Sequence, residues 1–142
     1  MSDQRRISRR IRGKKIVLLF LPILIGIFYF MHLKFYENQM MKIRGNMAQR
    51  RYRDSLSQIN RLRLLPFSET EELIYHRGES LLMTGKPDEA FTTWRQIRQK
   101  SEYYPRSILK ITEWLENQGR LTESEVEYRL ALSSKNTNLI EI

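Results

Sequence analysis

An uncharged apolar segment near the N-terminus constrains this chain more than any other feature. Residues 16–33 carry no charged side chain, and the apolar character extends to Tyr36 across Lys34. A helix rises about 1.5 Å per residue, so a segment of this length matches the roughly 30 Å hydrocarbon layer of a bilayer. Pro22 and Gly26 are compatible with this reading because spanning helices tolerate both. The sequence therefore predicts one transmembrane helix over residues 16–36.

The tail before this segment, residues 1–15, is strongly basic. A cleaved secretory signal also combines basic and apolar regions, but no small-residue cleavage site follows at residues 31–37. We therefore expect an uncleaved signal-anchor with its N-terminus in the cytoplasm, because Lys and Arg remain on that side. The repeat domain that follows would then be periplasmic or otherwise extracytoplasmic. The side chains expected to contact lipid headgroups are Arg5, Arg6, Arg9, Arg10, Arg12, Lys14 and Lys15.

The formal net charge of +9 is concentrated beside the predicted span. Residues 1–15 carry +6, residues 34–66 carry +6, and residues 67–142 carry −3. Such basicity suits anionic lipids, whereas nucleic-acid binding would favour aromatic residues within the tail for stacking on bases. We therefore expect membrane lipids as partners rather than nucleic acid, with a nucleic-acid or ribosome tether as the weaker alternative.

No pattern of catalytic residues is present. His32 and His76 are far apart in the sequence, and the chain has no cysteine and no metal-binding motif. The segment 13–15 lacks the first glycine and the hydroxyl residue of a phosphate-binding loop. The sequence therefore predicts a protein that is not an enzyme and has no catalytic residues, cofactor, metal or small-molecule substrate.

The region after residue 36 shows no strand patterns. Its sequence recurs with an internal period of about 34 residues, which is typical of helix-turn-helix solenoids. Gly85 and Gly119 are one period apart, as are Trp94 and Tyr128. The glycines suit helix ends because glycine enters the left-handed conformation at little cost. The pattern resembles the tetratricopeptide repeat family, of which this chain would be a membrane-anchored member.

The resemblance implies three repeat units followed by a short end at residues 139–142. In the central unit, residues 71–104, the matching positions are Gly78, Leu81, Gly85, Ala90 and Trp94. In the next unit, residues 105–138, the matching positions are Ile108, Ile111, Leu115, Gly119, Tyr128, Ala131 and Leu132, while Thr112 and Ser124 replace small residues. Residues 37–70 form a degenerate first unit, in which Arg50 or Arg51 stands in place of the turn glycine.

The resemblance also implies a concave groove formed by the first helix of each unit. Its expected lining residues are Glu72, Tyr75, Glu79, Leu82, Met83, Arg106, Leu109, Glu113, Glu116 and Asn117. This surface is mixed acidic and apolar and lacks the Lys and Asn clamps that hold a C-terminal carboxylate. A basic or amphipathic helical segment is the hypothetical partner. The alternative is that these glutamates are ordinary solvated residues.

The predicted fold is all-α, with a single N-terminal transmembrane helix followed by a short solenoid of about three helix-turn-helix units. We expect a non-enzymatic protein-interaction scaffold or assembly factor at the membrane, with protein partners in a larger membrane complex. The alternative is a structural accessory subunit of such a complex, held mainly through its transmembrane helix. Bacterial membrane-anchored repeat proteins with roles in secretion and cytochrome c maturation are similar in architecture alone.

Overall fold

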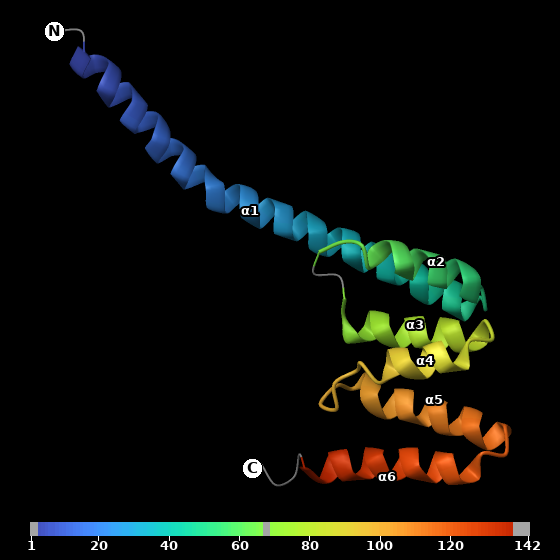
Figure 1. Ribbon diagram of the computed structural model, residues 1–142. Coiled ribbons are helices and arrows are strands. Elements are labelled where there is room, and N and C mark those ends of the chain that lie inside the picture. The colour runs from blue at the N-terminus through green and yellow to red at the C-terminus, as the bar shows by residue number, and fades with distance from the viewer. Residues whose placement is uncertain (1–2, 67–68, 138–142) are drawn as a thin grey trace. The chain divides into compact units, whose positions relative to one another are not determined.

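The computed structural model describes the backbone of residues 3–66 and 69–137, and the side chains of residues 21–66 and 69–133. All regular elements in these residues are helices, so the predicted all-α class is confirmed there (Figure 1). The helices are α1 (Asp3–Ala48), α2 (Tyr52–Leu62), α3 (Glu71–Met83), α4 (Pro87–Trp94), α5 (Tyr103–Asn117) and α6 (Leu121–Thr137). The chain divides into two compact units, residues 1–38 and 39–142.

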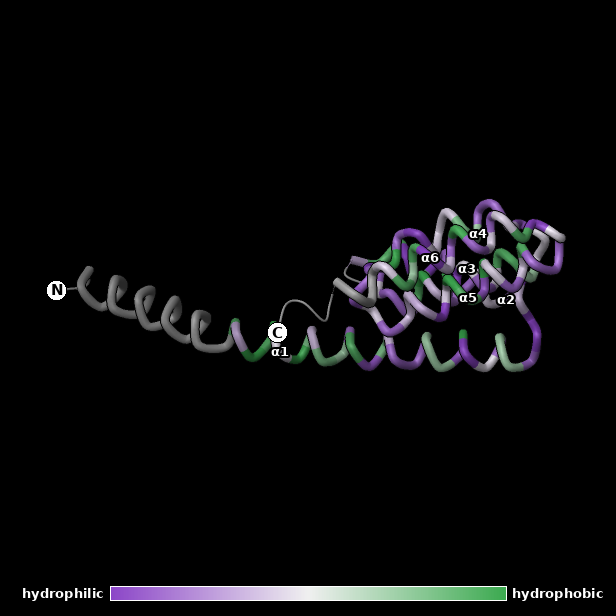
Figure 2. The backbone as a smooth tube through the Cα atoms, turned by 90° about the horizontal axis from the view of Figure 1, so that it is seen from below, coloured by the Kyte–Doolittle hydropathy of each residue, from purple (hydrophilic) through white to green (hydrophobic). Residues whose placement is uncertain are grey.

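The first unit contains the N-terminal part of α1, which includes Pro22 inside the helix. Its described side chains are apolar and exposed from Leu21 to Met31, and hydrophobic residues dominate this stretch of the tube in Figure 2. An ion pair between Lys34 Nζ and Glu37 Oε2, 3.1 Å long, lies one turn beyond.

The predicted transmembrane helix over residues 16–36 requires correction. Among the residues that the structure describes, no helix has both the length and the apolar character needed to cross a bilayer. Residues 16–20 and the seven basic residues expected at lipid headgroups lie outside the described side chains. The signal-anchor and the single-pass membrane localisation are overturned with the span.

The second unit contains three helical hairpins, formed by the end of α1 with α2, by α3 with α4, and by α5 with α6. Figure 1 shows α2 to α6 following one another along this unit. The first hairpin is linked by Asn46 Nδ2, which donates to Gln58 Oε1 at 3.0 Å. The packed helices are compatible with an α-solenoid.

The three hairpin turns share one backbone arrangement. The residue with positive φ is Arg50 (57°) in the first turn, Gly85 (83°) in the second and Gly119 (74°) in the third. In each turn the next residue donates its N–H to the carbonyl five positions earlier. These bonds are Arg51 to Asn46 at 2.8 Å, Lys86 to Leu81 at 3.0 Å, and Arg120 to Leu115 at 2.9 Å. This is the hydrogen bond of a Schellman motif, in which the left-handed residue ends the helix.

A small buried residue follows each turn at the same distance. Ser55, Ala90 and Ser124 are at most 2% exposed, and each donates its N–H to the carbonyl four positions earlier. The step from Ser55 to Ala90 is one position longer than the step from Ala90 to Ser124. Arg50, rather than Arg51, takes the position of the turn glycine. The left-handed turn residues are therefore 35 positions apart from Arg50 to Gly85 and 34 positions apart from Gly85 to Gly119.

The main hydrophobic core lies between the second and third hairpins. It consists of Leu81, Ala90, Phe91, Trp94, Ile97, Ile108, Ile111 and Leu115, all of them buried. The first hairpin contributes Ile43 and Ile59, both fully buried. The apolar positions recur every three or four residues, so each helix turns one stripe toward its neighbours.

Candidate protein-binding surface

The predicted groove residues lie on α3 and α5, where Tyr75 occupies the centre. The ring centroids of Tyr75 and Tyr103 are 5.6 Å apart, and those of Tyr75 and Trp94 are 6.3 Å apart. Trp94 Nε1 also donates to the backbone carbonyl of Tyr75 at 2.9 Å. These contacts hold Tyr75 half-buried against Trp94 of α4 and Tyr103 of α5.

Charged side chains from both helices surround this ring. Burial raises the pKa of the Tyr75 phenol, and the negative charges of Glu79 and Glu113 raise it further, while Arg106 lowers it. The guanidinium of Arg106 also lies 5.5 Å from the centroid of the Tyr103 ring. The structure therefore brings Tyr75, Glu79, Arg106 and Glu113 into one neighbourhood, although they come from two helices.

Most carboxylates in this neighbourhood have a positive neighbour. Arg44 Nε, on α1, donates to Glu72 Oε1 at 2.6 Å. His76 lies between two carboxylates, with Nε2 3.6 Å from Glu72 Oε1 and Nδ1 3.5 Å from Glu79 Oε2. Glu113 lies 3.4 Å from Lys110 Nζ. Cations therefore compensate two of these carboxylates, those of Glu72 and Glu113, so the surface attracts a basic segment less strongly than the acidic residues alone would indicate.

The remaining predicted residues differ in their surroundings. Met83 and Leu109 are exposed apolar side chains, at 54% and 46%. Leu82 is half-buried and packs against the core. Glu116 Oε1 accepts a hydrogen bond from Ser124 Oγ at 2.9 Å and so links α5 to α6. Asn117 is the exposed last residue of α5.

Sequence reasoning missed Arg44, His76 and Tyr103 as members of this surface. His76 shares a helix face with Glu72 and Glu79, at offsets of four and three positions, and this spacing could have revealed it. Arg44 is distant in sequence from its partner and lies on a helix that was interpreted as part of a degenerate unit. We call the surface formed by Arg44, Glu72, Tyr75, His76, Glu79, Tyr103, Arg106, Leu109 and Glu113 the α3–α5 face.

The α3–α5 face offers aromatic, apolar and charged groups. In the described part of the chain, no group of three or more His, Cys, Asp or Glu side chains could hold a metal ion. The hydroxyl of the buried Ser80 donates to Ser55 Oγ at 3.2 Å, and that of Ser107 donates to the carbonyl of Tyr104 at 2.7 Å. The chemistry of the α3–α5 face suits contact with another macromolecule.

Comparison with known proteins adds no relative: no family model, curated protein or solved structure matches this chain.

Proposed function

We propose that residues 39–137 form a tetratricopeptide-like protein-interaction scaffold or assembly factor, and that the protein catalyses no reaction. One observation carries the repeat identity. Three turns share the same left-handed residue position, the same hydrogen bond and the same buried small residue. Such units bury their apolar stripes against one another, and they present the first helices of the hairpins to partners.

The α3–α5 face is the proposed partner site. Tyr75 on α3 and Tyr103 on α5 supply flat apolar area, and Leu109 is an exposed apolar side chain farther along α5. Aromatic and apolar groups surrounded by charge are typical of protein interfaces. An amphipathic helical segment fits these features better than a purely basic one because two of the carboxylates, those of Glu72 and Glu113, already have cationic neighbours.

Paired substitutions of exposed leucines test this proposal. Affinity purification of the tagged full chain should recover specific partners, and Leu109→Lys should release them. Leu132→Lys is the matched control because Leu132 is also exposed, on α6. If both substitutions release the partners equally, or neither does, the α3–α5 face is not their binding site.

A second candidate function is that of a structural subunit held in a larger assembly through the apolar part of α1. The observation that favours it is the exposed apolar surface of Leu24, Phe28, Phe30 and Met31 in the first unit. Contiguous apolar surface of this kind marks an interaction site. Replacing Phe28 and Met31 with Ser should release such a subunit from a complex of fixed stoichiometry, whereas a scaffold would keep its clients.

A further inference from the structure

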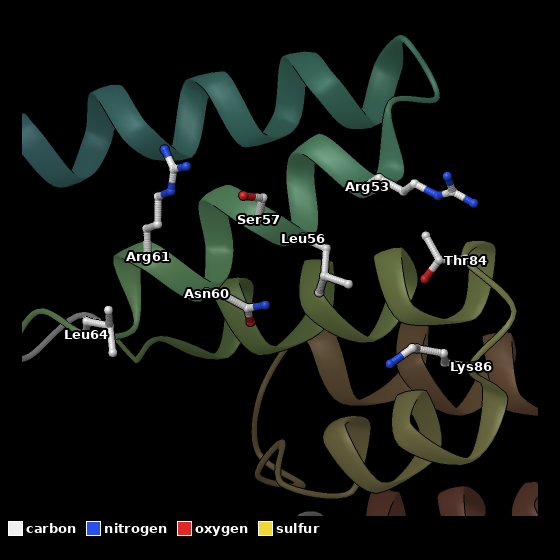
Figure 3. Close-up of a pocket in the computed structure, with 8 residues that line it drawn as sticks. All are labelled: Arg53, Leu56, Ser57, Asn60, Arg61, Leu64, Thr84 and Lys86. Carbon is white, nitrogen blue, oxygen red and sulfur yellow. The ribbon is translucent and has the colours of Figure 1, made fainter.

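A widely open cavity of about 660 Å³ lies between α2 and the turn that joins α3 to α4. Figure 3 shows that α2 forms one side, with Arg53 near the first turn of the helix and Arg61 near its end. Thr84 and Lys86 come from the α3–α4 turn on the other side. Leu56 adds an apolar contact from the middle of α2.

A second cavity, of about 540 Å³, adjoins the first and shares Arg53 and Thr84 with it. Arg50 and Arg51 also line it, together with one carboxylate, that of Asp54. We call the two cavities together the α2 groove. Its lining contains five cationic side chains and one anionic side chain.

The arginines of the α2 groove differ from most arginines elsewhere in the second unit. Arg95, Arg98 and Arg120 each contact a glutamate oxygen within 2.7 Å. Lys86 of the groove has such a partner too, Glu89 Oε1 at 2.8 Å.

Within the described residues, none of the four groove arginines has a carboxylate within ion-pair distance; these are Arg50, Arg51, Arg53 and Arg61. Their charge is therefore left for an anionic ligand. Uncompensated cations gathered in a concave surface raise the local concentration of such ligands.

The spacing of the cations indicates the class of ligand. Arg53 and Arg61 are eight positions apart on α2, which corresponds to about 12 Å along the helix axis. One small anion does not bridge that distance, whereas an extended peptide rises about 3.3 Å per residue and reaches both with acidic side chains about four residues apart. Leu56 and Leu64 provide apolar contact along the same wall.

A single-stranded nucleic acid fits the groove less well. Bases bind such grooves by stacking on aromatic side chains. Tyr52 is the one aromatic residue that lines the two cavities. Carboxylates can instead form bidentate hydrogen bonds with arginine.

We propose that the α2 groove binds an acidic peptide segment in extended conformation, in which carboxylate and apolar side chains alternate in contact with α2. This binding is separate from the partner binding proposed for the α3–α5 face. Failure of either proposal therefore leaves the other unaffected.

Fluorescence anisotropy with the full chain tests the proposal. The probe is a labelled peptide of about 12 residues with Glu at every fourth position and Leu midway between successive Glu residues, so that Glu and Leu alternate on one face of the extended peptide. A second probe carries Gln in place of Glu, and a third is a single-stranded oligonucleotide of equal charge. The variant Arg53→Gln with Arg61→Gln removes two groove cations, and Arg120→Gln with Arg129→Gln removes the same charge outside both the α2 groove and the α3–α5 face.

We expect the Glu peptide to bind and the groove double variant to weaken that binding at least about tenfold, as expected for loss of charge-assisted hydrogen bonds. The control double variant should change the affinity less than about twofold because both of its arginines lie outside the groove. Circular dichroism should show both variants folded, since all four side chains are exposed.

Three results would overturn the proposal. Equal weakening by the two double variants would show attraction to overall charge alone. Equal binding of the Gln peptide would show that carboxylates are not recognised. Tighter binding of the oligonucleotide, lost in the groove variant, would assign the groove to nucleic acid.

Discussion

The central hairpin, α3 with α4, and the last hairpin, α5 with α6, have the same turn geometry, but their helices pack together differently. Gly78 on α3 faces Trp94, which is 1% exposed. At the equivalent positions of the last hairpin, Thr112 is fully buried and Tyr128 is 39% exposed. A glycine lets the indole lie against the helix backbone, whereas the threonine side chain occupies that space. The difference teaches that the small and aromatic positions of a repeat are coupled.

The partial exposure of Tyr128 is shared by other side chains of α6. Ser124 and Glu127 are buried, but Leu121, Leu130 and Leu132 are more than half exposed. Glu127 Oε1 receives a hydrogen bond from Arg95 at 2.7 Å, so a polar contact links α6 to the central hairpin. The last hairpin therefore buries less apolar surface than the central one.

Removal of the two aromatic side chains should expose the largest contrast. Trp94→Ala should lower the free energy of unfolding by about 3–5 kcal/mol, because it leaves a cavity in the core. Tyr128→Ala should cost about 1 kcal/mol, because the ring is already partly solvated. Urea denaturation of both variants measures the difference. Similar costs would show that Tyr128 packs as tightly as Trp94.

Replacing either of two helical glycines with alanine adds one methyl group, and the two replacements should change the stability of the protein in opposite directions. A Cβ on Gly78 would lie against the indole ring of Trp94, closer than any real Cβ contact, whereas a Cβ on Gly45 would have no neighbour within 4 Å. Gly78→Ala should therefore destabilise the protein by about 2 kcal/mol through overpacking. Gly45→Ala should stabilise it by up to about 1 kcal/mol because alanine favours helix.

Thermal unfolding of these two alanine variants provides the measurement. A stable Gly78→Ala protein would mean that the indole can move away from α3. The coupling inferred between the small and aromatic positions would then be absent.

A smaller change in stability is expected at the first turn, where arginine occupies the position that glycine occupies in the other two turns. Arg50 has φ of 57°, a conformation that costs a non-glycine residue about 1 kcal/mol. Arg50→Gly should therefore raise stability by somewhat less than about 1 kcal/mol, since glycine also loses more entropy on folding. Arg51→Gly is the control, because Arg51 has φ of −86° and gains nothing from glycine. Equal effects of the two substitutions in chemical denaturation would contradict the shared turn geometry.

The smallest effect concerns pH. The pKa of Glu71 is lowered by its hydrogen bond with Ser101 and by that with Arg98, and this carboxylate joins the start of α3 to the segment after α4. A carboxyl whose pKa is lower in the folded state adds stability above its unfolded pKa and loses it as the pH falls through the folded value.

Glu71→Gln should therefore lower stability at pH 7 and flatten its decline between about pH 5 and pH 3. Glu123→Gln is the comparison, because the pKa of Glu123 is also lowered, by a hydrogen bond from Arg120 within the same turn. Stability curves measured across this pH range should change more for Glu71, since its partners are more distant in sequence. Identical curves for the two variants would show that distance between partners does not matter here.

Local chemistry allowed much of the second unit to be predicted. Glycine spacing identified the turns at Gly85 and Gly119, and the absence of strand patterns gave the helical class of the described residues. The transmembrane prediction was wrong, because among the described residues no helix is both long and apolar enough to cross a bilayer. Of the candidate face, Tyr75, Glu79, Arg106 and Glu113 were anticipated as neighbours.

The sequence by itself determined where α3 and α5 end, because Gly85 and Gly119 act within a few positions. Tertiary structure alone decided that Arg50 would adopt the glycine conformation, that the first repeat would be one position longer than the second, and that Gly78 would meet the Trp94 ring. It also brought Arg44 to Glu72, and among the described residues it left the four arginines of the α2 groove with no carboxylate within ion-pair distance. These features depend on contacts between residues that are distant in sequence, and only the packing of the helices fixes such contacts.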